Sequence, residues 1–386
     1  MIKMPKKILF CATVDTHFES FHLPYFKWFK DQGWEVHIAA NGVLDLPFVD
    51  EKYNIPVQRS PFKFKNIHSS FQLKKIIEQN KFDIIHCHTP MGGVISRLAG
   101  RNARKAGTKV IYTAHGFHFY EGAPIQNWLL YYPIEKWLCN YTDCLITINN
   151  EDYHFAKKHF KNKQIEHVYG VGVNTSKFKP IELDAKIKQK KSLGYQADDF
   201  LLFYAAEFNE NKNQKFLISM MSSIKKQTPQ VKLLLAGEGF LMDECKKLAK
   251  HLGLEEMINF LGHRTDIDAI LPICDVTVAS SLREGLPVNI MEAMSCGLPV
   301  VATENRGHKE LIKNDRNGWI VGKNSFLEMG EKIKILVNDP EKKIQFGNYG
   351  RKMIEEKYCI QNVLEQKSKI YKKFMNEKEA IKWLAQ

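Results

Sequence analysis

The sequence has no hydrophobic run long enough to cross a bilayer and no closely spaced pair of cysteines. A membrane-spanning helix needs about 18–20 consecutive apolar residues, and no segment of the 386-residue chain provides them, which excludes an integral membrane protein. The eight cysteines never form a C-x-x-C pair, so we expect reduced core thiols rather than disulfides or a cysteine metal site. The first residues lack the apolar stretch and cleavage site of a signal peptide, and we therefore expect a cytoplasmic protein.

Acidic residues are in the minority, and the excess of positive charge is uneven. The chain holds 56 Lys and Arg against 43 Asp and Glu, a formal net charge of +13. Residues 1–180 carry 24 basic and 15 acidic side chains, so most of the excess lies in the first half. This distribution predicts an anionic partner such as a nucleic acid, a membrane surface or a phosphorylated ligand.

Short β-branched runs alternate with amphipathic stretches along most of the chain. Strands separated by helices of ten or more residues predict parallel βαβ units. A polar, Lys-rich stretch at 177–199 interrupts this alternation of strands and helices. From about residue 324 onward the sequence predicts helices only. We therefore predict two doubly wound α/β domains, at 1–176 and 177–360, and a helix at 361–386 that packs back on the first domain. Predicted strands cover residues 7–13, 35–40, 83–88, 109–115, 144–148, 165–170, 200–206, 231–237, 258–262, 276–280, 299–303 and 318–321.

The segment 280–307, SSLREGLPVNIMEAMSCGLPVVATENRG, carries the strongest functional signal. A strand ends at Ser280, a loop contains Glu284, and a helix eight residues further on carries Glu292. The start of that helix directs its positive end at an anion, and a diphosphate fits there. Carboxylates in the loop and in the helix can accept hydrogen bonds from sugar hydroxyls. A surface position for Glu292 is disfavoured because its helix is otherwise apolar.

This block resembles the E-x7-E signature of family 4 of the retaining glycosyltransferases, which have the GT-B architecture of two facing Rossmann-like domains. The resemblance implies that Glu284 is a catalytic residue that contacts the donor sugar and that Glu292 binds the nucleotide ribose. It extends over nearly the whole chain, including VKLLLAGEGF at 231–240 and the interdomain crossover at 168–180. The donor-binding residues that it implies are Gly237, Gly239, His263, Arg264, Glu284, Gly285, Leu286, Pro287 and Glu292.

The segment 203–218 departs from the family pattern at one position. The family usually has an Arg and then a Lys there, which neutralise the donor diphosphate. Lys212 matches the second residue and is implied to be catalytic, but Glu207 stands where the Arg is expected. Arg264 and Arg283 are the alternative cations that the sequence offers. What replaces the usual arginine is left open by the sequence.

The first domain contains several histidines that are candidate functional residues. His115 follows a predicted strand at the position where the family has a His facing the donor sugar, so the resemblance implies a catalytic role. His118, three residues further on, is a candidate for the acceptor site beside His115. The first loop holds His17, a candidate for the acceptor site, whereas His22 is interpreted as part of a helix face. His86, Cys87 and His88 resemble a metal cluster, but residues 86 and 88 share one face of a strand and no distant ligand pair completes a site, so we predict no metal there.

The tripeptide Asp266-Ile267-Asp268 matches the metal-binding D-x-D motif of the other main glycosyltransferase fold. It follows Thr265 at a predicted helix start, where Thr and Asp serve as N-terminal caps. The family resemblance implies a metal-independent enzyme. We therefore predict capping at this position and no metal or other cofactor.

Together these features predict a retaining hexosyl- or N-acetylhexosaminyltransferase that uses a nucleotide sugar, most simply a UDP-sugar. A UDP-sugar epimerase of the same architecture and a catalytically silent nucleotide-sugar sensor are the alternatives. No nucleic-acid-binding module is recognisable. Aromatic residues accompany the basic ones, as in 62–65 and 128–132, which predicts salt-sensitive attachment to the inner face of a bacterial membrane. A polyprenyl-diphosphate-linked sugar is the acceptor expected there, in the synthesis of capsular or other surface polysaccharide.

Overall fold

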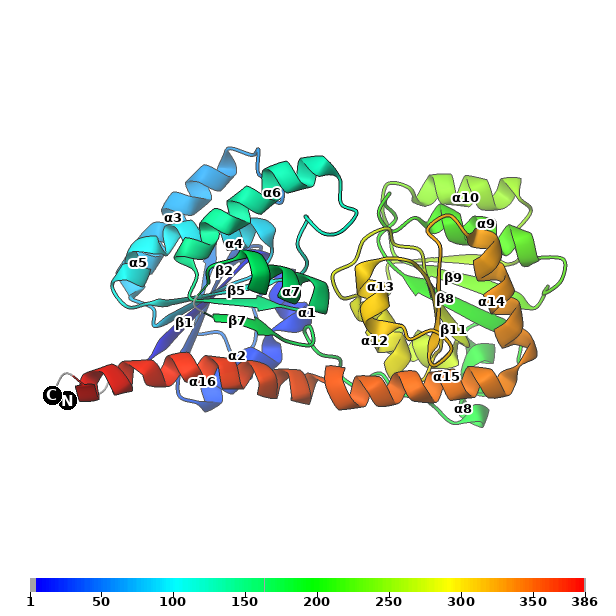
Figure 1. Cartoon of the computed structure of the whole chain (residues 1–386). Helices are drawn as coiled ribbons and strands as arrows, with labels where there is room; N and C mark the ends of the chain where they lie inside the picture. Colours follow the sequence, from blue (N-terminus) through cyan, green and yellow to red (C-terminus); the bar gives the residue numbers. More distant parts are fainter. Residues whose placement is uncertain (1–4, 163, 385–386) are drawn as a thin grey trace. The chain divides into compact units, whose positions relative to one another are not determined.

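The computed structural model describes residues 5–162 and 164–384, and the side chains as far as residue 375. The chain divides into two compact units. Unit 1 is formed by Met1–Val171 together with Val363–Gln386, and unit 2 by Gly172–Asn362 (Figure 1). The boundary between the two units at Val171 therefore falls a few residues before the predicted boundary at 176.

Unit 1 is a seven-stranded parallel sheet with the order β3-β2-β1-β4-β5-β6-β7. The sequence analysis missed its edge strand β3, a polar segment whose residues are all at least partly exposed. The central strands read as continuous apolar runs because both faces of a parallel sheet are covered. The strands are β1 Lys7–Val14, β2 Glu35–Asn41, β3 Glu51–Asn54, β4 Ile84–Cys87, β5 Lys109–Ala114, β6 Cys144–Thr147 and β7 Gln164–His167.

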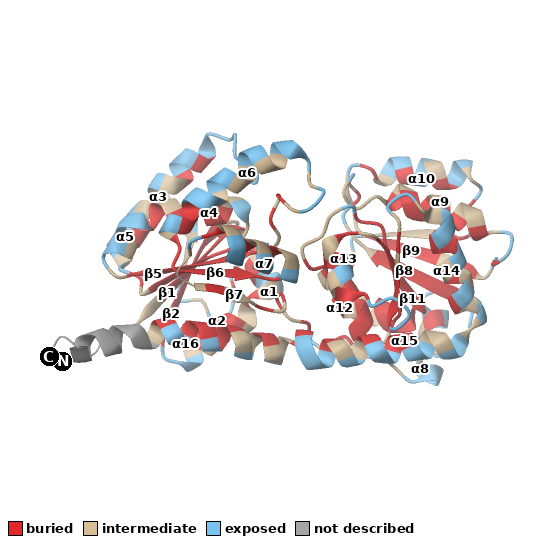
Figure 2. Cartoon of the chain, viewed as in Figure 1, coloured by how far each residue is buried: buried red, intermediate tan, exposed pale blue. Residues whose placement is uncertain are grey.

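Helices cover both faces of this sheet. Two apolar clusters form the core, one on each side, and Figure 2 shows the buried strands between half-exposed helices. The C-terminal helix α16, Ile360–Leu384, contributes Val363, Ile370, Tyr371 and Phe374 to one of these clusters. The other helices are α1 Thr16–Phe21, α2 Leu23–Asp31, α3 Lys65–Asn80, α4 Pro90–Ala99, α5 Arg101–Lys105, α6 Ile125–Leu138 and α7 Asn150–His159.

Unit 2 is a six-stranded parallel sheet with the order β10-β9-β8-β11-β12-β13. Its strands are β8 Phe200–Ala205, β9 Val231–Ala236, β10 Ile258–Gly262, β11 Val276–Ala279, β12 Val300–Thr303 and β13 Gly318–Val321. They match the six strands expected from the sequence, as does the helical region from Phe326 onward. The helices are α8 Leu183–Ser192, α9 Gln214–Ile224, α10 Met242–His251, α11 Ile267–Ile270, α12 Val288–Ser295, α13 Arg306–Leu311, α14 Phe326–Asn338 and α15 Pro340–Met353, with a π-helical turn at Ile354–Tyr358.

In both sheets the strand order reverses next to the first strand of the unit. Strand β1 lies between β2 and β4, and the chain crosses from β3 to β4 to reach the other side of β1; likewise β8 lies between β9 and β11, and the chain crosses from β10 to β11. Loops at the carboxyl ends of the two strands that flank such a switch point diverge, and open α/β sheets bind their ligands there. The two switch points therefore locate the candidate sites.

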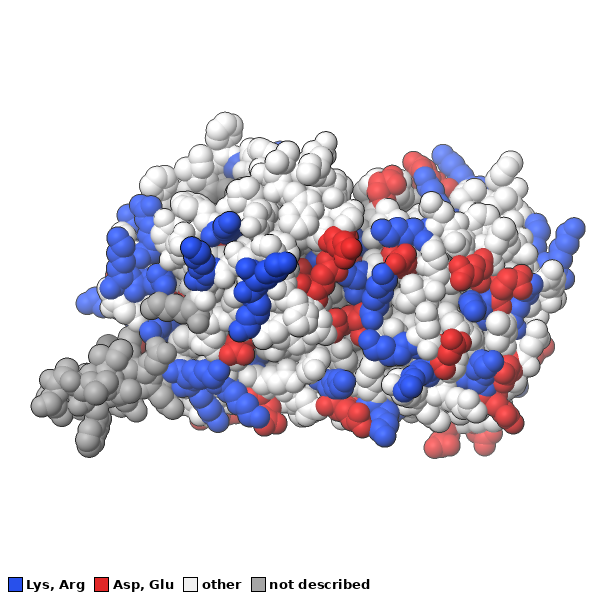
Figure 3. All heavy atoms as spheres, in the orientation of Figure 1, with Lys and Arg blue, Asp and Glu red and all other residues white. Residues whose placement is uncertain are grey.

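The surface of unit 1 is unevenly charged. Figure 3 shows Lys and Arg gathered over α5, whereas the surface over α6 is mostly uncharged. Two of the arginines that contribute to the basic composition have acidic partners: Arg97 is buried and pairs with Glu135 at 2.8 Å, and Arg104 pairs with Asp143 at 2.9 Å. Within the described residues, no helix is long and apolar enough to span a membrane.

Candidate functional site

The switch point of unit 2 brings together two residues that the sequence predicts to be catalytic. Lys212 lies in the loop after β8, and Glu284 lies in the loop after the adjacent strand β11. Their side chains form an ion pair, with Lys212 Nζ 2.5 Å from Glu284 Oε1. Both side chains retain some exposure to solvent, 24% for Lys212 and 15% for Glu284. The pair therefore places a cation and a carboxylate where a ligand can reach both.

The loops that carry this pair are fixed by buried hydrogen bonds. The Tyr204 hydroxyl and the Ser281 hydroxyl are 2.7 Å apart, and the Ser280 hydroxyl donates to the Lys212 carbonyl at 2.8 Å. Asn305 Nδ2 donates to the Ser281 carbonyl at 2.8 Å. Strands β8, β11 and β12 are thus joined at their carboxyl ends, which holds the pair in a pre-organised position.

Gly307, at the start of α13, allows the Glu284 loop to lie against this helix. A Cβ at position 307 would be 2.7 Å from Glu284 Cβ and 3.0 Å from its carbonyl carbon. Only glycine fits such a close backbone approach. The sequence analysis included Gly307 in the 280–307 block but gave it no role, because spacing alone does not show what a glycine contacts.

The predicted loop residues 285–287 lead directly into α12. Pro287 is its N-terminal cap residue and Leu286 is buried, which anchors the loop in the core. Asn289 Nδ2 donates to the Ala205 carbonyl at 2.9 Å and so joins the first turn of the helix to β8. The amino end of α12 is therefore held at the same switch point as Lys212.

Gly237 and Gly239 shape a second part of this edge. Gly237 has φ +130°, its N–H donates to the Gly262 carbonyl at 2.7 Å, and a Cβ there would be 2.1 Å from the Ala206 carbonyl oxygen. A Cβ at Gly239 would likewise be 2.3 Å from the Phe208 carbonyl oxygen. The loops after β8, β9 and β10 consequently pack backbone against backbone, which places Gly237 and Gly239 beside the segment of His263, an exposed residue.

Asp266 does not cap α11 in the way that the sequence predicts. It occupies the cap position of this helix, but its side chain makes no capping hydrogen bond. It binds Arg264 instead, with Nε 2.8 Å from Oδ1, because a guanidinium offers two parallel donors to a carboxylate. Asp268 lies 3.5 Å from Lys177. Glu207, at the position where the family has an arginine, accepts a hydrogen bond from Asn209 at 3.0 Å.

Glu292 lies on α12, half-buried among apolar neighbours. Burial raises the pKa of its carboxyl to about 7, with Lys177 acting in the opposite direction and Asp268 in the same direction as burial. A carboxyl group whose ionised form is made this unfavourable by burial is typical of a functional site, in which a bound ligand supplies its hydrogen-bonding partner.

The switch point of unit 1 gathers histidines from four segments. His17 and His22 come from α1 and its end, His88 follows β4, and His115 follows β5. The rings of His22 and His88 have centroids 4.2 Å apart, and His17 lies 5.0 Å from His115. His22, interpreted from the sequence as part of a helix face, lies at the junction of α1 and α2, and its side chain is buried in this cluster.

His118 does not join the cluster. Its ring stacks obliquely on Tyr131 of α6, with centroids 4.6 Å apart. His86 shares a strand face with His88, as predicted, and their centroids are 4.1 Å apart. Both of its ring nitrogens are occupied, by Tyr371 and Thr113 at 2.8 Å each, so its role is structural.

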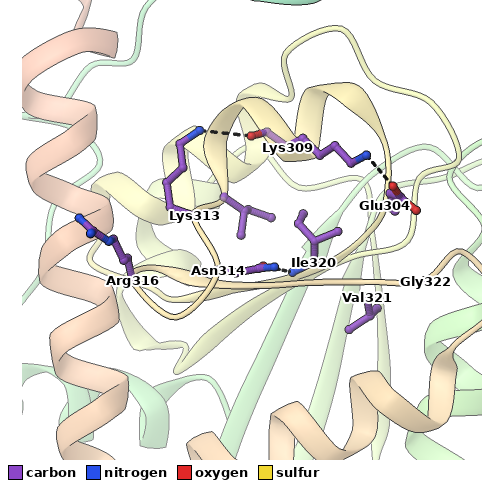
Figure 4. A pocket seen from close by; sticks show the side chains of 9 residues that line it. Glu304, Lys309, Lys313, Asn314, Arg316, Ile320, Val321 and Gly322 are labelled. Atoms are coloured by element: carbon purple, nitrogen blue, oxygen red, sulfur yellow. Dashed lines mark hydrogen bonds and ion pairs between the residues drawn. The ribbon is translucent and has the colours of Figure 1, made fainter. Parts of the chain in front are cut away.

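A separate open depression of about 540 Å³ lies between α13 and β13 (Figure 4). It is lined by residues including Lys309, Lys313 and Arg316. Lys309 pairs with Glu304 at 2.5 Å, and Lys313 reaches the carbonyl of Lys309. None of the residues predicted to be functional lines this depression, so it is not the candidate site.

Two known protein families match the two halves of the chain. The family "Glycosyl transferases group 1" matches residues 185–353, and the family "Glycosyl transferase 4-like" matches residues 7–149. The chain is 48% identical to a Bacillus subtilis (strain 168) protein named "Putative glycosyltransferase EpsD", over 97% of this chain and 98% of that protein. The chain belongs to the family 4 glycosyltransferases.

This glycosyltransferase is also similar to more distantly related proteins. It is 30% identical, over 67% of each chain, to the Escherichia coli "UDP-Gal:alpha-D-GlcNAc-diphosphoundecaprenol alpha-1,3-galactosyltransferase". The crystal structure of Anabaena Alr3699/HepE in complex with UDP and glucose superposes with a TM-score of 0.78 at 20% identity, covering 95% of this chain and all of that one. The sucrose-phosphate synthase of Thermosynechococcus elongatus gives 0.79 at 17% identity, over 96% and 100%. These structures confirm the predicted GT-B fold.

Proposed function

We propose that this glycosyltransferase moves a sugar, with retention of anomeric configuration, from a UDP-sugar to a lipid-linked saccharide during surface-polysaccharide synthesis. The observation that carries the proposal is the Lys212–Glu284 ion pair at the switch point of unit 2. The E. coli relative, named for a UDP-galactose donor and a diphosphoundecaprenol acceptor, supports the choice of both substrates. The family resemblance supports retention.

Each residue of the donor site has a distinct task in this proposal. The donor diphosphate displaces Glu284 as the partner of Lys212, whose ammonium stabilises the charge that develops on the leaving group. The amino end of α12 adds its positive dipole. Glu284, released from the lysine, accepts hydrogen bonds from the sugar hydroxyls, and Glu292 accepts them from the ribose. No metal is required at the diphosphate.

Arg306 is our candidate for the cation that the family pattern places at position 207. It begins α13, directly beside Gly307, and its Nε donates to the Glu284 carbonyl at 3.3 Å. Its guanidinium therefore lies next to the sugar-binding loop, whereas Arg264 is engaged with Asp266. The sequence analysis missed Arg306 because it lies far along the chain from Lys212.

The test of the transfer reaction is UDP release from a UDP-sugar, measured with and without a polyprenyl-diphosphate-linked sugar. A transferase releases UDP in an acceptor-dependent manner, an epimerase converts the sugar without release, and a sensor does neither. Lys212→Met should abolish UDP release. Lys215→Met is the control and should not abolish it, because Lys215 pairs with Glu244 on the surface. Acceptor-independent sugar interconversion or a fully active Lys212→Met enzyme would contradict the proposal.

We further propose that unit 1 binds the inner membrane surface through α3, α6 and the loop before α3. Large apolar side chains are exposed on these segments, including Phe64 at 87%, Phe71 at 70% and Leu129 at 72%. Lys63 and Lys65 flank Phe64 and are exposed too. Exposed aromatic and basic side chains together suit an anionic headgroup layer, in which each cation contributes about 1 kcal/mol.

Sedimentation with vesicles that contain anionic lipid tests this attachment. We expect binding at low salt that weakens as salt rises, because the contribution of the lysines is screened. The variant Phe64→Ser/Phe71→Ser should bind more weakly than the wild type, and Phe240→Ser, which alters an exposed aromatic residue of unit 2, serves as the control. Failure to sediment even at low salt would favour a soluble acceptor.

A further inference from the structure

Three histidine side chains of unit 1 lie close together, and each has a ring nitrogen that lacks a hydrogen-bond partner among the residues that the structure describes. Among the described residues, the Nε2 atoms of His17, His22 and His88 are all buried and unpaired. One ligand atom from each of these side chains lies within 4.8 Å of those from the other two. The side chains of His22 and His88 are almost completely buried, at 1% and 0% exposure. Buried polar atoms are normally satisfied, so this convergence indicates a missing partner.

The neighbouring contacts indicate what these nitrogens can accept. His22 Nδ1 lies 3.4 Å from the His17 carbonyl oxygen, an acceptor only, so this contact places the proton on Nδ1 and leaves a lone pair on Nε2. Neutral imidazole with a free lone pair is a ligand for Zn²⁺ and related ions.

We propose that His17, His22 and His88 bind one divalent transition-metal ion of the Zn²⁺ class. Such an ion lies about 2.0–2.1 Å from each nitrogen, which sets the nitrogens roughly 3.4 Å apart in a tetrahedral site. The ligand atoms of the three side chains lie within 4.8 Å of one another, and binding of an ion brings them to the shorter spacing.

The site has the supporting contacts that metal-binding histidines use. His88 Nδ1 lies 3.3 Å from Nε2 of His115, the residue predicted to face the donor sugar. A metal on His88 Nε2 requires the proton of that ring on Nδ1, which then donates to His115 Nε2. His115 must in turn hold its own proton on Nδ1. Metal binding would therefore fix the tautomer of His115.

A buried anion is the competing occupant, and Lys367 distinguishes the two. Its ammonium is buried, lies 4.4 Å from the centre of the Tyr25 ring and has no hydrogen-bond partner among the described residues. Burial lowers the pKa of Lys367 to about 7, and its charge acts on His17, His22 and His115. This positive charge opposes a metal ion and favours an anion. The orientation of His22, which offers a lone pair rather than a proton, favours the metal ion.

Calorimetric titration of the metal-free protein with ZnCl₂, without donor or acceptor, tests the site. We expect one saturable ion per chain, with affinity reduced at least tenfold in His22→Gln and in His88→Gln. His308→Gln is the matched control, because His308 is also buried with an unpaired Nε2 but stands outside the cluster, and it should bind Zn²⁺ like the wild type. Wild-type protein that binds no Zn²⁺, or variants that bind it equally well, would overturn the proposal.

Two further measurements keep the test decisive if a histidine variant does not fold. Co²⁺ bound to the wild-type protein should give the intense visible absorption of a tetrahedral nitrogen site, and the weak spectrum of an octahedral aquo ion would contradict it. Lys367→Met should bind Zn²⁺ several-fold more tightly, because a like charge is removed. Binding of inorganic diphosphate that is lost in Lys367→Met, without Zn²⁺ binding, would assign the cluster to an anion. None of these outcomes depends on the transfer reaction.

Discussion

Replacing Glu292 by glutamine should separate stability from function. Burial raises the Glu292 pKa from 4.5 to about 7, which means that the charged form of this carboxyl is disfavoured in the folded state. A pKa that differs by one between the folded and unfolded states is equivalent to about 1.36 kcal/mol, so the penalty reaches about 3 kcal/mol when the group is ionised in both states. Because the side chain retains partial exposure, we take about 2–3 kcal/mol as the expected range, by the same conversion.

The direction of the pH dependence follows from the raised pKa. Below pH 4.5 the carboxyl is protonated in both the folded and the unfolded chain, and it imposes no penalty. As pH rises from 4.5 to 7 the unfolded state loses its proton first, so the wild type loses stability relative to Glu292→Gln. The variant should therefore gain about 2–3 kcal/mol in urea unfolding at pH 8 and nothing at pH 4.5.

The same substitution should weaken nucleotide binding. The ribose hydroxyls donate hydrogen bonds, and an ionised carboxylate accepts them better than a neutral amide does. Wild-type affinity for UDP should rise between pH 6 and pH 8, whereas that of Glu292→Gln should stay flat and lie roughly tenfold lower at pH 8, equivalent to about 1.4 kcal/mol. Urea unfolding and UDP calorimetry on both proteins test this. Equal stability at pH 8, or equal UDP affinity there, would refute the reasoning.

Three further predictions concern the donor loop, the diphosphate and the core. Glu284→Gln should retain UDP affinity while turnover falls at least tenfold, and Gly307→Ala, which pushes against Glu284, should reduce turnover similarly; unchanged initial rates would contradict both. UDP affinity should be the same in EDTA and in excess Mg²⁺, since the proposed diphosphate contacts involve no metal; a Mg²⁺-dependent affinity in calorimetry would show that the D-x-D was dismissed wrongly. Arg97→Met, which leaves Glu135 without its buried partner, should cost about 3–5 kcal/mol in urea unfolding, and a loss below about 1 kcal/mol would mean that Glu135 finds water.

The sequence predicted the fold well because its signals are local. Apolar runs of four to eight residues separated by helices are sufficient to indicate a parallel sheet, and only β3, Glu51–Asn54, lacked such a run. The E-x7-E block placed Glu284 by its spacing, and the structure brings Lys212 to it.

What the sequence could not show depends on contacts between distant segments. The burial of His22 could not be predicted because it arises from contacts with Phe10 of β1 and with His88, which follows β4. Asp266 was predicted to be a helix cap because the sequence does not show the conformation of the Arg264 side chain. That side chain binds the Asp266 carboxylate in place of the helix N–H groups. The convergence of His17, His22 and His88 likewise follows from the strand order β2-β1-β4, which spacing along the chain does not encode.

The return of the chain to unit 1 has a consequence for the order of folding during synthesis. Val363, Ile370, Tyr371 and Phe374 complete an apolar cluster whose other buried members come from the first 168 residues, and Tyr371 contacts the His86 ring through its hydroxyl at 2.8 Å. Unit 1 therefore leaves the ribosome with an open face that only the later segment 363–374 can close. Unit 2 has all of its strands before that point and can fold first. A nascent chain stalled before residue 363 should expose unit 1 to protease while unit 2 is already resistant.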